Sequence, residues 1–281
     1  MMDENTVQSF WNAHPCGEGL VGGLSDDYEE FFKRYDAFRY GESKHLLGCL
    51  DGIDFKEKRV LEIGLGLGAD AEQIIRRGGL YSGVDLTDQS VSRVATRFAI
   101  RGLPYERLVV GSACNLPFDT ASFDIVFSHG VLHHIPEIGL AQAEIRRVLK
   151  PNGRLIAMLY AKYSLNYLLS ICVLRRAALA LIYAMHLDPG GKVGQHLANA
   201  RANGLRRYLK MGNFIHRNTD GPLNPYSKVY SLRDVRRDFT AFDVLSVHKE
   251  FMHVPPLPVS WLPLKALLGW HLWVEMRLKP E

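Results

Sequence analysis

The chain has 281 residues, of which 47% are hydrophobic and 23% are charged, and its formal net charge is +4. This composition is that of an ordinary globular protein, and it excludes a disordered, collagen-like or disulfide-stapled chain. The charge is unevenly distributed, with 17 basic and 22 acidic side chains in residues 1–160 against 17 basic and 8 acidic ones in residues 161–281. We therefore expect the second half to attract an anionic ligand or surface.

The four cysteines stand far apart and form no CxxC pair. They predict neither a disulfide framework nor a metal site, and reduced thiols are typical of a cytoplasmic protein. The first ten residues lack the basic and apolar regions of a secretory signal. We therefore expect a cytoplasmic chain without a bound metal.

Short apolar runs alternate with helical patterns between residues 59 and 160. The pattern predicts five strands, over residues 59–63, 80–84, 107–110, 123–127 and 154–160. It predicts helices between them, from the glycines to residue 77, over 88–101 and over 137–149, the last ended by the stop signal of residues 150–153. Strands that alternate with helices in this way imply right-handed crossovers and a parallel sheet of the α/β class.

The flanking segments are less regular. Residues 1–50 contain three short helical patterns, over 7–12, 26–38 and 42–50, and are expected to form an N-terminal helical arm or lid. Residues 161–230 begin with a long apolar helix candidate, continue with a helix over 195–210 and end in a polar loop, which suggests an inserted helical cap. In residues 231–281, a helix capped by Ser231 precedes two further strands, over 242–251 and 270–278. The predicted domains are therefore 1–50, 51–160, 161–230 and 231–281.

The sharpest local motif runs from Glu62 to Asp70 and contains three glycines between a strand and a helix. Glycines there allow unusual backbone torsions and a close approach of ligand to main chain. Asp85 ends the next strand, about 20 residues on, where a carboxylate can accept bonds from two ribose hydroxyls. The same residues also satisfy the dinucleotide fingerprint, so a nucleotide-dependent oxidoreductase is an alternative. Glu62 favours a cationic sulfonium or ammonium group over a pyrophosphate.

Three further motifs help to separate these alternatives, over residues 111–118, 122–135 and 147–155. Together with the glycine loop and Asp85, they resemble the class I S-adenosylmethionine-dependent methyltransferases. The likeness is strongest to the branch of ubiquinone/menaquinone-type and small-molecule enzymes, and it covers roughly residues 58–160. It implies a Rossmann-like, seven-stranded, mostly parallel sheet with helices on both faces, and S-adenosylmethionine as cofactor.

The resemblance assigns cofactor contacts to the glycine loop and to the end of the second strand. Glu62, Gly64 and Gly66 would line the methionine end of the cofactor. Asp85 would hold the ribose hydroxyls, and Leu86 would lie against the adenine.

Two further cofactor contacts fall after the third and fourth strands. Ser112 and Ala113 stand where the family often has Gly-Asp-Ala, whose acid bonds the exocyclic amine of adenine. Because a serine hydroxyl forms a weaker, uncharged bond, adenine anchoring would depend more on the backbone of Ala113. Ser128, at the end of the fourth strand, would lie beside the methionine moiety.

Histidines follow the fourth strand, and histidine is the commonest general base near neutral pH. His129 lies nearest to where the methyl group must emerge, and is the first candidate. His133 is the second, although members of the resembled family with varied chemistries carry a similar Leu-His-His, so a packing role for His133 and His134 is an equal alternative.

Candidate substrate contacts lie outside the predicted core. His14 belongs to an aromatic segment that could fold over the site as a lid or simply form an N-terminal arm. The polar loop near residues 218–230 offers Asp220, Asn224, Tyr226 and Lys228. Polar loops on a rigid scaffold often bind substrate, and the alternative is a turn-rich connector.

Residues 164–185 form an apolar stretch of 22 residues with Arg175 and Arg176 at its middle. Each central arginine costs about 2.5–3.5 kcal/mol on membrane insertion, so a spanning helix is not expected. This stretch and the aromatic tail around residues 255–273 are interpreted first as walls of an apolar substrate pocket. Contact with a lipid surface, and so a membrane-peripheral location, is the second interpretation.

These observations favour a methyltransferase acting on a small, partly apolar metabolite through an oxygen, nitrogen or carbon acceptor. Two alternatives are an S-adenosylmethionine-binding module without methyl transfer and the nucleotide-dependent oxidoreductase. Nucleic acid is not an expected partner, because the chain lacks an Asn/Asp-Pro-Pro-Tyr/Phe motif for a flipped base. The acceptor atom and the oligomeric state do not follow from the sequence.

Overall fold

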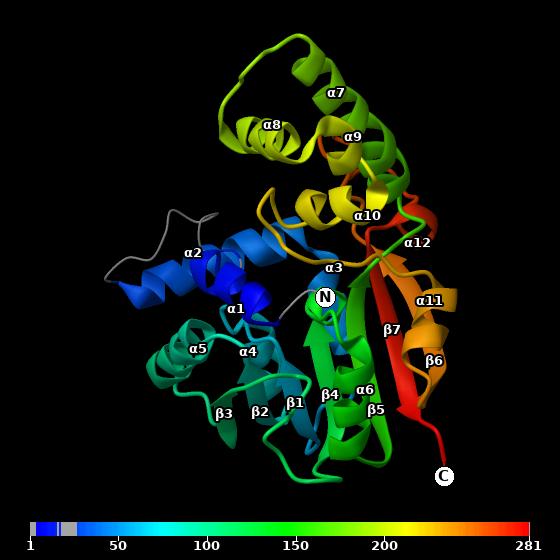
Figure 1. Ribbon diagram of the computed structural model, residues 1–281. Helices are drawn as coiled ribbons and strands as arrows, with labels where there is room; N and C mark the ends of the chain where they lie inside the picture. The colour runs from blue at the N-terminus through cyan, green and yellow to red at the C-terminus, as the bar shows by residue number, and fades with distance from the viewer. Residues whose placement is uncertain (1–3, 16, 18–26, 281) are drawn as a thin grey trace.

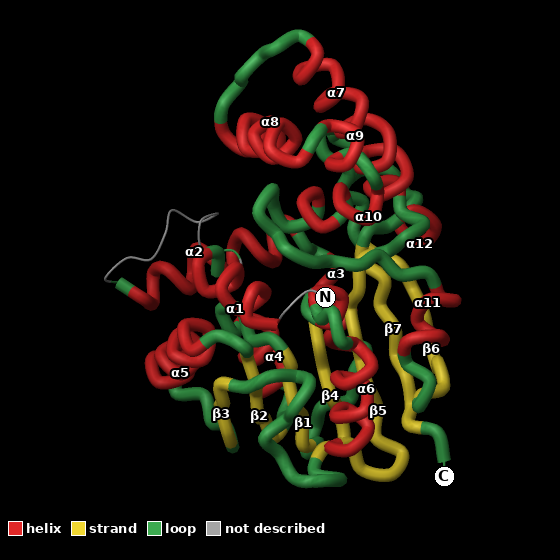
Figure 2. Tube along the Cα trace, viewed as in Figure 1, coloured by secondary structure: helices red, strands yellow, loops and turns green. Residues whose placement is uncertain are grey.

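The computed structural model describes residues 4–15, 17 and 27–280. Seven strands form one sheet in the order β3-β2-β1-β4-β5-β7-β6 (Figures 1 and 2). The strands are β1 (Arg59–Ile63), β2 (Leu80–Asp85), β3 (Arg107–Val110), β4 (Phe123–His129), β5 (Leu149–Tyr160), β6 (Phe242–Glu250) and β7 (His271–Leu278). β1 to β5 pair in parallel, and β7 runs antiparallel to both β5 and β6. The predicted α/β fold with a mostly parallel sheet is confirmed.

Helices cover both faces of the sheet because successive strand residues point to opposite sides. On one face, Val60, Tyr81 and Ile125 form a core with α3 (His45–Asp51), α4 (Ala69–Arg76) and α5 (Asp88–Arg101). On the other face, strand residues such as Leu61 and Val126 pack against α6 (Ile138–Val148) and α11 (Leu232–Asp238). The near-continuous apolar strands in the sequence are explained by this burial on two sides.

The N-terminal segment contributes α1 (Glu4–Ala13) and α2 (Tyr28–Glu42), which lie over the carboxyl ends of the strands (Figure 1). α2 buries Phe31 and Phe32 in a small cluster with the start of α4. Asp36 of α2 also receives two bonds of 2.7 Å from the buried Arg97 of α5. These contacts fix α2 beside the glycine loop. The polar face of α2 is thereby placed at the carboxyl edge of the sheet.

Residues between β5 and β6 form the cap, defined here as residues 161–230 (top of Figure 1). Its helices are a π-helix (Asn166–Arg175), α7 (Arg176–Ala184), α8 (Gly191–Asn203), α9 (Leu205–Tyr208), α10 (Met211–Phe214) and a short 3-10 turn (His216–Asn218). They share a core of their own, in which Leu179, Leu197 and Phe214 pack with Trp270 from the C-terminal tail. α12 (Lys265–Leu268) follows in that tail.

The N-terminal helices differ from their predicted bounds by up to four residues, and three further differences concern β5 and the cap. β5 begins at Leu149 rather than Arg154, because Leu149 pairs with Phe123 of β4. The expected helix over 195–210 is two helices, divided at Gly204, which has a φ of +79°. The apolar helix candidate is a π-helix that continues into α7.

Two sequence signals correspond to observed structural features. Ser231 caps α11, as expected, and forms a reciprocal capping box with Asp234. In the described part of the chain, one helical stretch, Asn166–Ala184, has the length and apolar composition of a membrane span, with a mean hydropathy of 1.6 and 17% of that stretch buried. Its low burial distinguishes it from an ordinary core helix.

Candidate active site

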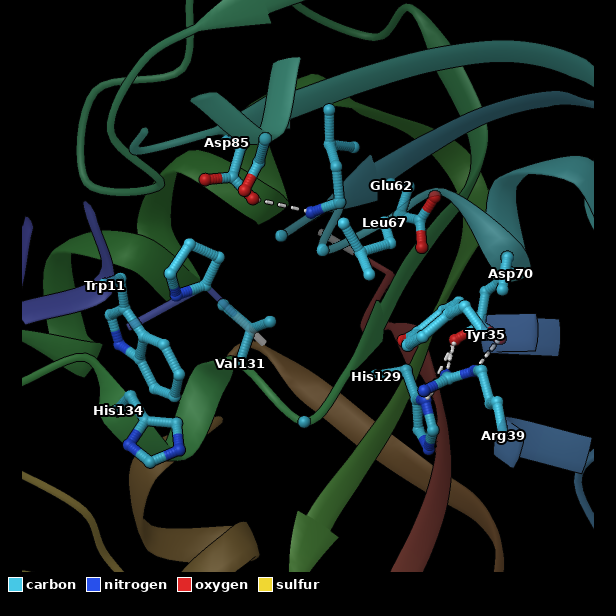
Figure 3. A pocket seen from close by; sticks show the side chains of 17 residues that line it. Trp11, Tyr35, Arg39, Glu62, Leu67, Asp70, Asp85, His129, Val131 and His134 are labelled. Carbon is cyan, nitrogen blue, oxygen red and sulfur yellow. Dashed lines mark hydrogen bonds and ion pairs between the residues drawn. The ribbon is translucent and has the colours of Figure 1, made fainter. Parts of the chain in front are cut away.

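A cavity lies at the carboxyl ends of β1, β2 and β4, beneath α1 and α2 (Figure 3). Open parallel sheets bind ligands at this edge. The empty space, counted to the open mouth, is about 750 Å³. The lining residues are Trp11, Pro15, Tyr35, Arg39, Glu62, Gly64, Leu65, Gly66, Leu67, Ala69, Asp70, Asp85, Ser90, His129, Gly130, Val131 and His134.

The glycine loop forms the floor of the cavity. Gly64 has a φ of +82°, and a Cβ atom at this position would overlap the side chain of Val131. Its backbone N–H donates to the carbonyl of Val84 over 2.8 Å, which joins the loop to β2. Gly66 has a φ of +52° and open space where a Cβ would stand. The loop therefore leaves main chain exposed to a ligand in a conformation that favours glycine.

Asp85 lies at one side of the cavity, at the end of β2 (Figure 3). Its carboxylate accepts from the backbone N–H of Leu65 over 2.7 Å and from the hydroxyl of Thr87 over 2.7 Å. Burial raises the pKa of Asp85, while the bonds from Thr87 and the glycine loop act in the opposite direction. Next to it, Gln8 of α1 donates to the carbonyl of Leu86 over 2.7 Å.

Glu62 is a buried carboxylate at the end of β1. It accepts a bond of 2.5 Å from the hydroxyl of Tyr81. Burial raises the pKa of Glu62 well above its ordinary value, and the nearby Asp70 and Asp85 raise it further. Three carboxylic side chains thus line one cavity, and a positively charged ligand beside them would favour their ionised forms.

A second polar cluster occupies the other side of the cavity, where Arg39 of α2 meets Asp70 and His129 (Figure 3). The Arg39 Nη2 atom lies 2.5 Å from Asp70 Oδ2 and 2.6 Å from His129 Nδ1. His129 Nδ1 also lies 2.9 Å from Asp70 Oδ2. Burial alone would raise the pKa of Asp70, but Arg39 and His129 hold it below its usual range.

His129, the first predicted base, therefore reaches the cavity wall. Burial lowers its pKa, against the opposing effect of Asp70. Its ring stacks on Trp273 with the centroids 5.2 Å apart, and its Nε2 atom is buried with no hydrogen-bond partner among the described residues. The contacts of Nδ1 with Arg39 and Asp70 fix the ring, and burial favours the neutral form of the imidazole.

The structure does not bring His133, the second predicted base, to the cavity. His133 is completely buried, and neither ring nitrogen has a hydrogen-bond partner in the described part of the chain. Its ring lies 3.8 Å from that of Tyr160, centroid to centroid. Burial lowers the pKa of His133 well below its ordinary value. This environment corresponds to the packing role that the sequence left as an alternative.

His134 reaches the cavity instead of its neighbour. Its ring meets Trp11 of α1 edge to face, with the centroids 5.1 Å apart. Its Nδ1 atom donates to the carbonyl of Tyr226 over 2.8 Å. Trp11 and His134 together form the side of the cavity nearest to the N-terminal arm.

The serines predicted to contact cofactor have different positions. Ser112 donates to the carboxylate of Glu4, in α1, over 2.5 Å, and Ala113 packs against the main core beside it. Ser128 is completely buried and donates to the carbonyl of Ile63 over 3.1 Å. Ser128 therefore joins β4 to β1 and does not line the cavity, because its side chain points into the sheet contact.

His14 does not line the cavity, although its neighbours Trp11 and Pro15 do. Its ring stacks on Phe10, with the centroids 4.7 Å apart, and its Nδ1 atom lies 3.0 Å from the carbonyl of Phe10. The aromatic arm thus covers the cavity through Trp11 rather than through the predicted histidine.

The polar loop of the cap packs behind the cavity wall. Asp220 accepts from the hydroxyl of Tyr160 over 2.8 Å and lies 3.3 Å from His134 Nε2. Burial would raise the pKa of Asp220, but His134 and Tyr160 hold it below its usual range. Asp220 therefore supports a lining residue without lining the cavity itself.

The other predicted loop residues serve the loop's own structure. Asn224 is completely buried and donates to the hydroxyl of Thr219 over 3.1 Å. Tyr226 stacks on His216, and Lys228 pairs with the carboxylate of Asp238. None of these three side chains lines the cavity, and the Asn224 amide and the Lys228 ammonium are bonded within or beside the loop.

Tyr35 and Arg39 are lining residues that the sequence prediction missed. They stand four residues apart on α2, a spacing that places both on one helix face. The spacing of Tyr35 and Arg39 could be seen in the sequence, but the ion pair between Arg39 and Asp70 could not be predicted from it. Asp70 belonged to the predicted glycine motif, and only the packing of α2 against α4 brings the two together.

Comparisons with known proteins agree with this geometry. Residues 61–157 match the family model described as a methyltransferase domain. Over 105 residues, the chain is 35% identical to a phthiotriol/phenolphthiotriol dimycocerosates methyltransferase of Mycobacterium leprae, covering 37% of this chain and 38% of that protein. It is 36% identical over 102 residues to a fatty-acid O-methyltransferase of Mycolicibacterium smegmatis, covering 36% of each chain.

A solved structure of an S-adenosylmethionine-dependent methyltransferase from Aquifex aeolicus superimposes with a TM-score of 0.54 and 14% identity, covering 91% of this chain and all of that one. The fold is thus shared along most of the chain. The sequence likeness to the curated relatives, in contrast, spans less than two fifths of their length.

Residues 61–157 form a class I S-adenosylmethionine-dependent methyltransferase domain, as the sequence motifs predict. S-adenosylmethionine is the cofactor of this class of domain. The cavity fits such a molecule, because Asp85 suits a ribose diol, Gly64 has no room for a side chain, and the carboxylates Glu62 and Asp70 suit an ammonium or sulfonium group. Arg39 adds a guanidinium that suits a carboxylate.

Proposed function

We propose that this chain transfers a methyl group from S-adenosylmethionine to a small, partly apolar metabolite. The observation that carries the proposal is one cavity that joins the glycine loop and Asp85 to the Arg39–Asp70–His129 cluster at the carboxyl edge of the sheet. The domain class and the geometry support the same activity.

The chain's residues would act mainly by positioning. Asp85 would hold the ribose, Arg39 the carboxylate of the methionine moiety, and the buried acids would favour the charged sulfur. Aligning two reactants supplies about 7–11 kcal/mol of a reaction barrier. α1 and α2 lie over the cavity, and Trp11 closes its wall. Exclusion of water by this cover would protect the donor.

His129 is the better placed of the two predicted bases. Its lowered pKa keeps the imidazole neutral near pH 7, the form that can accept a proton. An acceptor hydroxyl, amine or activated carbon would benefit from this group, whereas a carboxylate acceptor would need only alignment. His133, enclosed away from the cavity, is not part of the proposed chemistry.

An apolar acceptor is supported by two observations. The relatives named above are, by their names, methyltransferases of phthiotriol/phenolphthiotriol dimycocerosates and of fatty acids. In this chain, the cavity wall combines Trp11, Leu65, Leu67 and Val131 with few polar groups beyond the two clusters.

We also propose a cytoplasmic, membrane-peripheral location. The cap exposes apolar side chains, with Val173 52%, Leu181 60% and Met185 57% exposed. Residues 161–230 carry ten basic side chains and two acidic ones. An apolar, largely exposed helix in a segment of net positive charge suits an anionic lipid surface. Sedimentation with phosphatidylglycerol vesicles but not with phosphatidylcholine vesicles is the expected result, and equal recovery with both would contradict it.

Calorimetric titration with S-adenosylhomocysteine and with NAD tests the cofactor assignment. Binding of S-adenosylhomocysteine alone is expected, and binding of NAD alone would restore the oxidoreductase alternative. Incubation with methyl-labelled cofactor and lipid, fatty-acid and aromatic fractions tests transfer. Label in a metabolite supports the enzyme, while cofactor binding without transfer to any fraction would favour a binding module.

A further inference from the structure

A second cavity lies inside the cap and shares no lining residue with the first. It opens to solvent and is lined by the π-helix and α7, by α8, by the segment from α10 to Pro222 and by part of the C-terminal tail. Its empty space, counted to the mouth, is about 1130 Å³. The lining residues are Arg175, Ala178, Leu179, Ile182, Lys192, Val193, His196, Phe214, Arg217, Asn218, Thr219, Gly221, Pro222, His253, Pro255 and Pro256.

The charge of this wall has one sign. Arg175, Lys192 and Arg217 line the cavity, and none of the described lining residues is Asp or Glu. Arg175 donates from Nη1 to the carbonyl of Asn218 over 2.8 Å and from Nε to the hydroxyl of Ser170 over 3.0 Å, and both acceptors are neutral. A partly buried guanidinium with only neutral acceptors is costly, and an anion in the cavity would offset that cost.

The neighbouring histidine responds to the same positive field. Burial, followed by the charges of Arg175 and Arg217, lowers the pKa of His196 to about 4. Burial also lowers the pKa of Arg175 itself. The region therefore disfavours additional positive charge and has room for negative charge.

Apolar side chains form much of the remaining wall, beside the polar His196, Asn218, Thr219 and His253. Leu179 and Ile182 come from α7 and Phe214 from α10, and all three belong to the core of the cap. Pro222, Pro255 and Pro256 complete this wall without side-chain donors. A cationic rim beside an apolar wall matches a molecule with an anionic head and a hydrocarbon chain.

We propose that the cap cavity binds a single-chain amphiphile with an anionic head, either a carboxylate or a phosphate. Arg217, Lys192 and Arg175 would contact the head, and the apolar wall would hold the chain. This inference does not depend on methyl transfer, because the cavity is separate from the candidate active site. The amphiphile could arrive as a free fatty acid or from a phospholipid surface, and the chemistry recognised is the same.

Binding to the full-length protein is measured by calorimetry with dodecanoate, dodecyl phosphate and dodecanol, each below its micelle-forming concentration. The two anions are expected to bind at least about ten-fold more tightly than the alcohol, since charge-assisted bonds are roughly twice as strong as neutral ones. Equal affinity for dodecanol and dodecanoate would overturn the proposal.

Variants locate the binding. The double variant K192Q/R217Q is expected to weaken dodecanoate about ten-fold or more and to leave dodecanol unchanged. Arg201→Gln, on the same α8 helix but outside the lining set, is the matched control and should leave both affinities unchanged. Unchanged S-adenosylhomocysteine binding and unfolding temperature show that the double variant is folded. A folded double variant with unaltered dodecanoate affinity would place the anion elsewhere.

Vesicles distinguish the source of the amphiphile. If monomeric dodecanoate binds and phosphatidylcholine vesicles that contain lysophosphatidylglycerol compete with it, whereas vesicles of phosphatidylcholine alone do not, the cavity accepts a single-chain lipid from a membrane. If monomeric dodecanoate binds and vesicles do not compete, the ligand is a free acid. Vesicle binding that K192Q/R217Q leaves unchanged, without any binding of the monomeric anions, would overturn the proposal and assign these charges to surface attraction.

Discussion

The two cavities of this protein have opposite electrostatic character. The cavity at the sheet edge is lined by Glu62, Asp70 and Asp85 with a single arginine, whereas the cap cavity is lined by cations and by no acid among the described residues. The first suits a cofactor with a cationic sulfur, and the second suits an anion. The two proposed sites would thus separate ligands of different charge, one at the edge of the sheet and one in the cap.

The cavities also differ in how they are built. The sheet-edge cavity is formed by strand ends and by a glycine loop whose torsions leave room for a ligand. The cap cavity is formed by short helices that pack on their own small core. Parallel strands hold their ends in register, so the first site depends on a few backbone positions, while the second depends on side-chain packing.

The largest expected effect follows from Gly64→Ala. The added methyl group would overlap Val131 at a φ of +82°, and overpacking of about 1–3 kcal/mol adds to a left-handed penalty of about 1–2 kcal/mol. Affinity for S-adenosylhomocysteine should fall at least about 30-fold by calorimetry, with dodecanoate binding unchanged. In Gly66→Ala, no atom lies within 4 Å of the added methyl group, so only the backbone strain of the left-handed conformation remains. This variant should therefore lose less affinity for S-adenosylhomocysteine. Equal losses in both variants would show that the Val131 contact does not matter.

A smaller effect is expected for Asp85→Ala. Loss of a charge-assisted contact worth about 1.5–3 kcal/mol should weaken S-adenosylhomocysteine ten-fold or more. The same change frees the backbone N–H of Leu65 and the hydroxyl of Thr87. Thr87→Val, which keeps the acid, is the control for that second loss. An unchanged dissociation constant in Asp85→Ala would show that the ribose assignment is wrong.

His133 predicts a pH dependence of stability. Its folded pKa lies well below the unfolded value, so the unfolded chain binds the proton first and the free energy of unfolding falls as the pH drops below about 6.5. At pH 5.5 this single group should cost about 1.4 kcal/mol. Urea unfolding at pH 7.5 and at pH 5.5 measures how much the free energy of unfolding falls between the two. In His133→Leu, this decrease should be smaller than in the parent by about 1.4 kcal/mol. An identical loss in both proteins would mean that His133 accepts a proton in the folded state.

The smallest expected effect concerns the arm over the adenine side. Glu4 of α1 accepts a bond from Ser112, and Glu4→Gln keeps the helix while removing the charge. Cofactor affinity should change by less than about five-fold, as for an exposed polar contact. Asn5→Asp, which adds charge on the same helix turn, is the comparison. A loss in Glu4→Gln as large as that in Asp85→Ala would make Glu4 a principal cofactor contact.

Much of the fold could be read from residue patterns. The strands from Arg59 to Val110 and the capped helix after Ser231 have the predicted bounds to within a residue, because buried strands and side-chain caps have local signatures. The start of β5 at Leu149 had no such signature, since it depends on pairing with Phe123. The interruption at Gly204 was readable only as a glycine within a helical pattern.

The candidate site was partly readable for the same reason. Gly64, Gly66 and Asp85 are local motif positions and line the cavity, whereas Arg39 reaches it through the packing of α2. Ser128 and His133 lie close to the motif in sequence but point into the sheet and the cap interface. The direction of the Ser128 side chain depends on its position along the strand, and that of His133 on its position in a short helical turn. Neither direction can be assigned without knowing which elements pack against that strand and that turn.

The sequence by itself determined the α/β sheet, the glycine loop, its acidic partner on β2 and the contrast in charge between the two halves. These are properties of local torsion, periodicity and composition. Only the tertiary structure decided that Arg39 joins Asp70 and His129, that His133 is enclosed, and that the cations of the cap surround a cavity. Those outcomes depend on contacts between residues that are far apart in the chain. Such contacts form, and contribute to stability, only when the helices pack together.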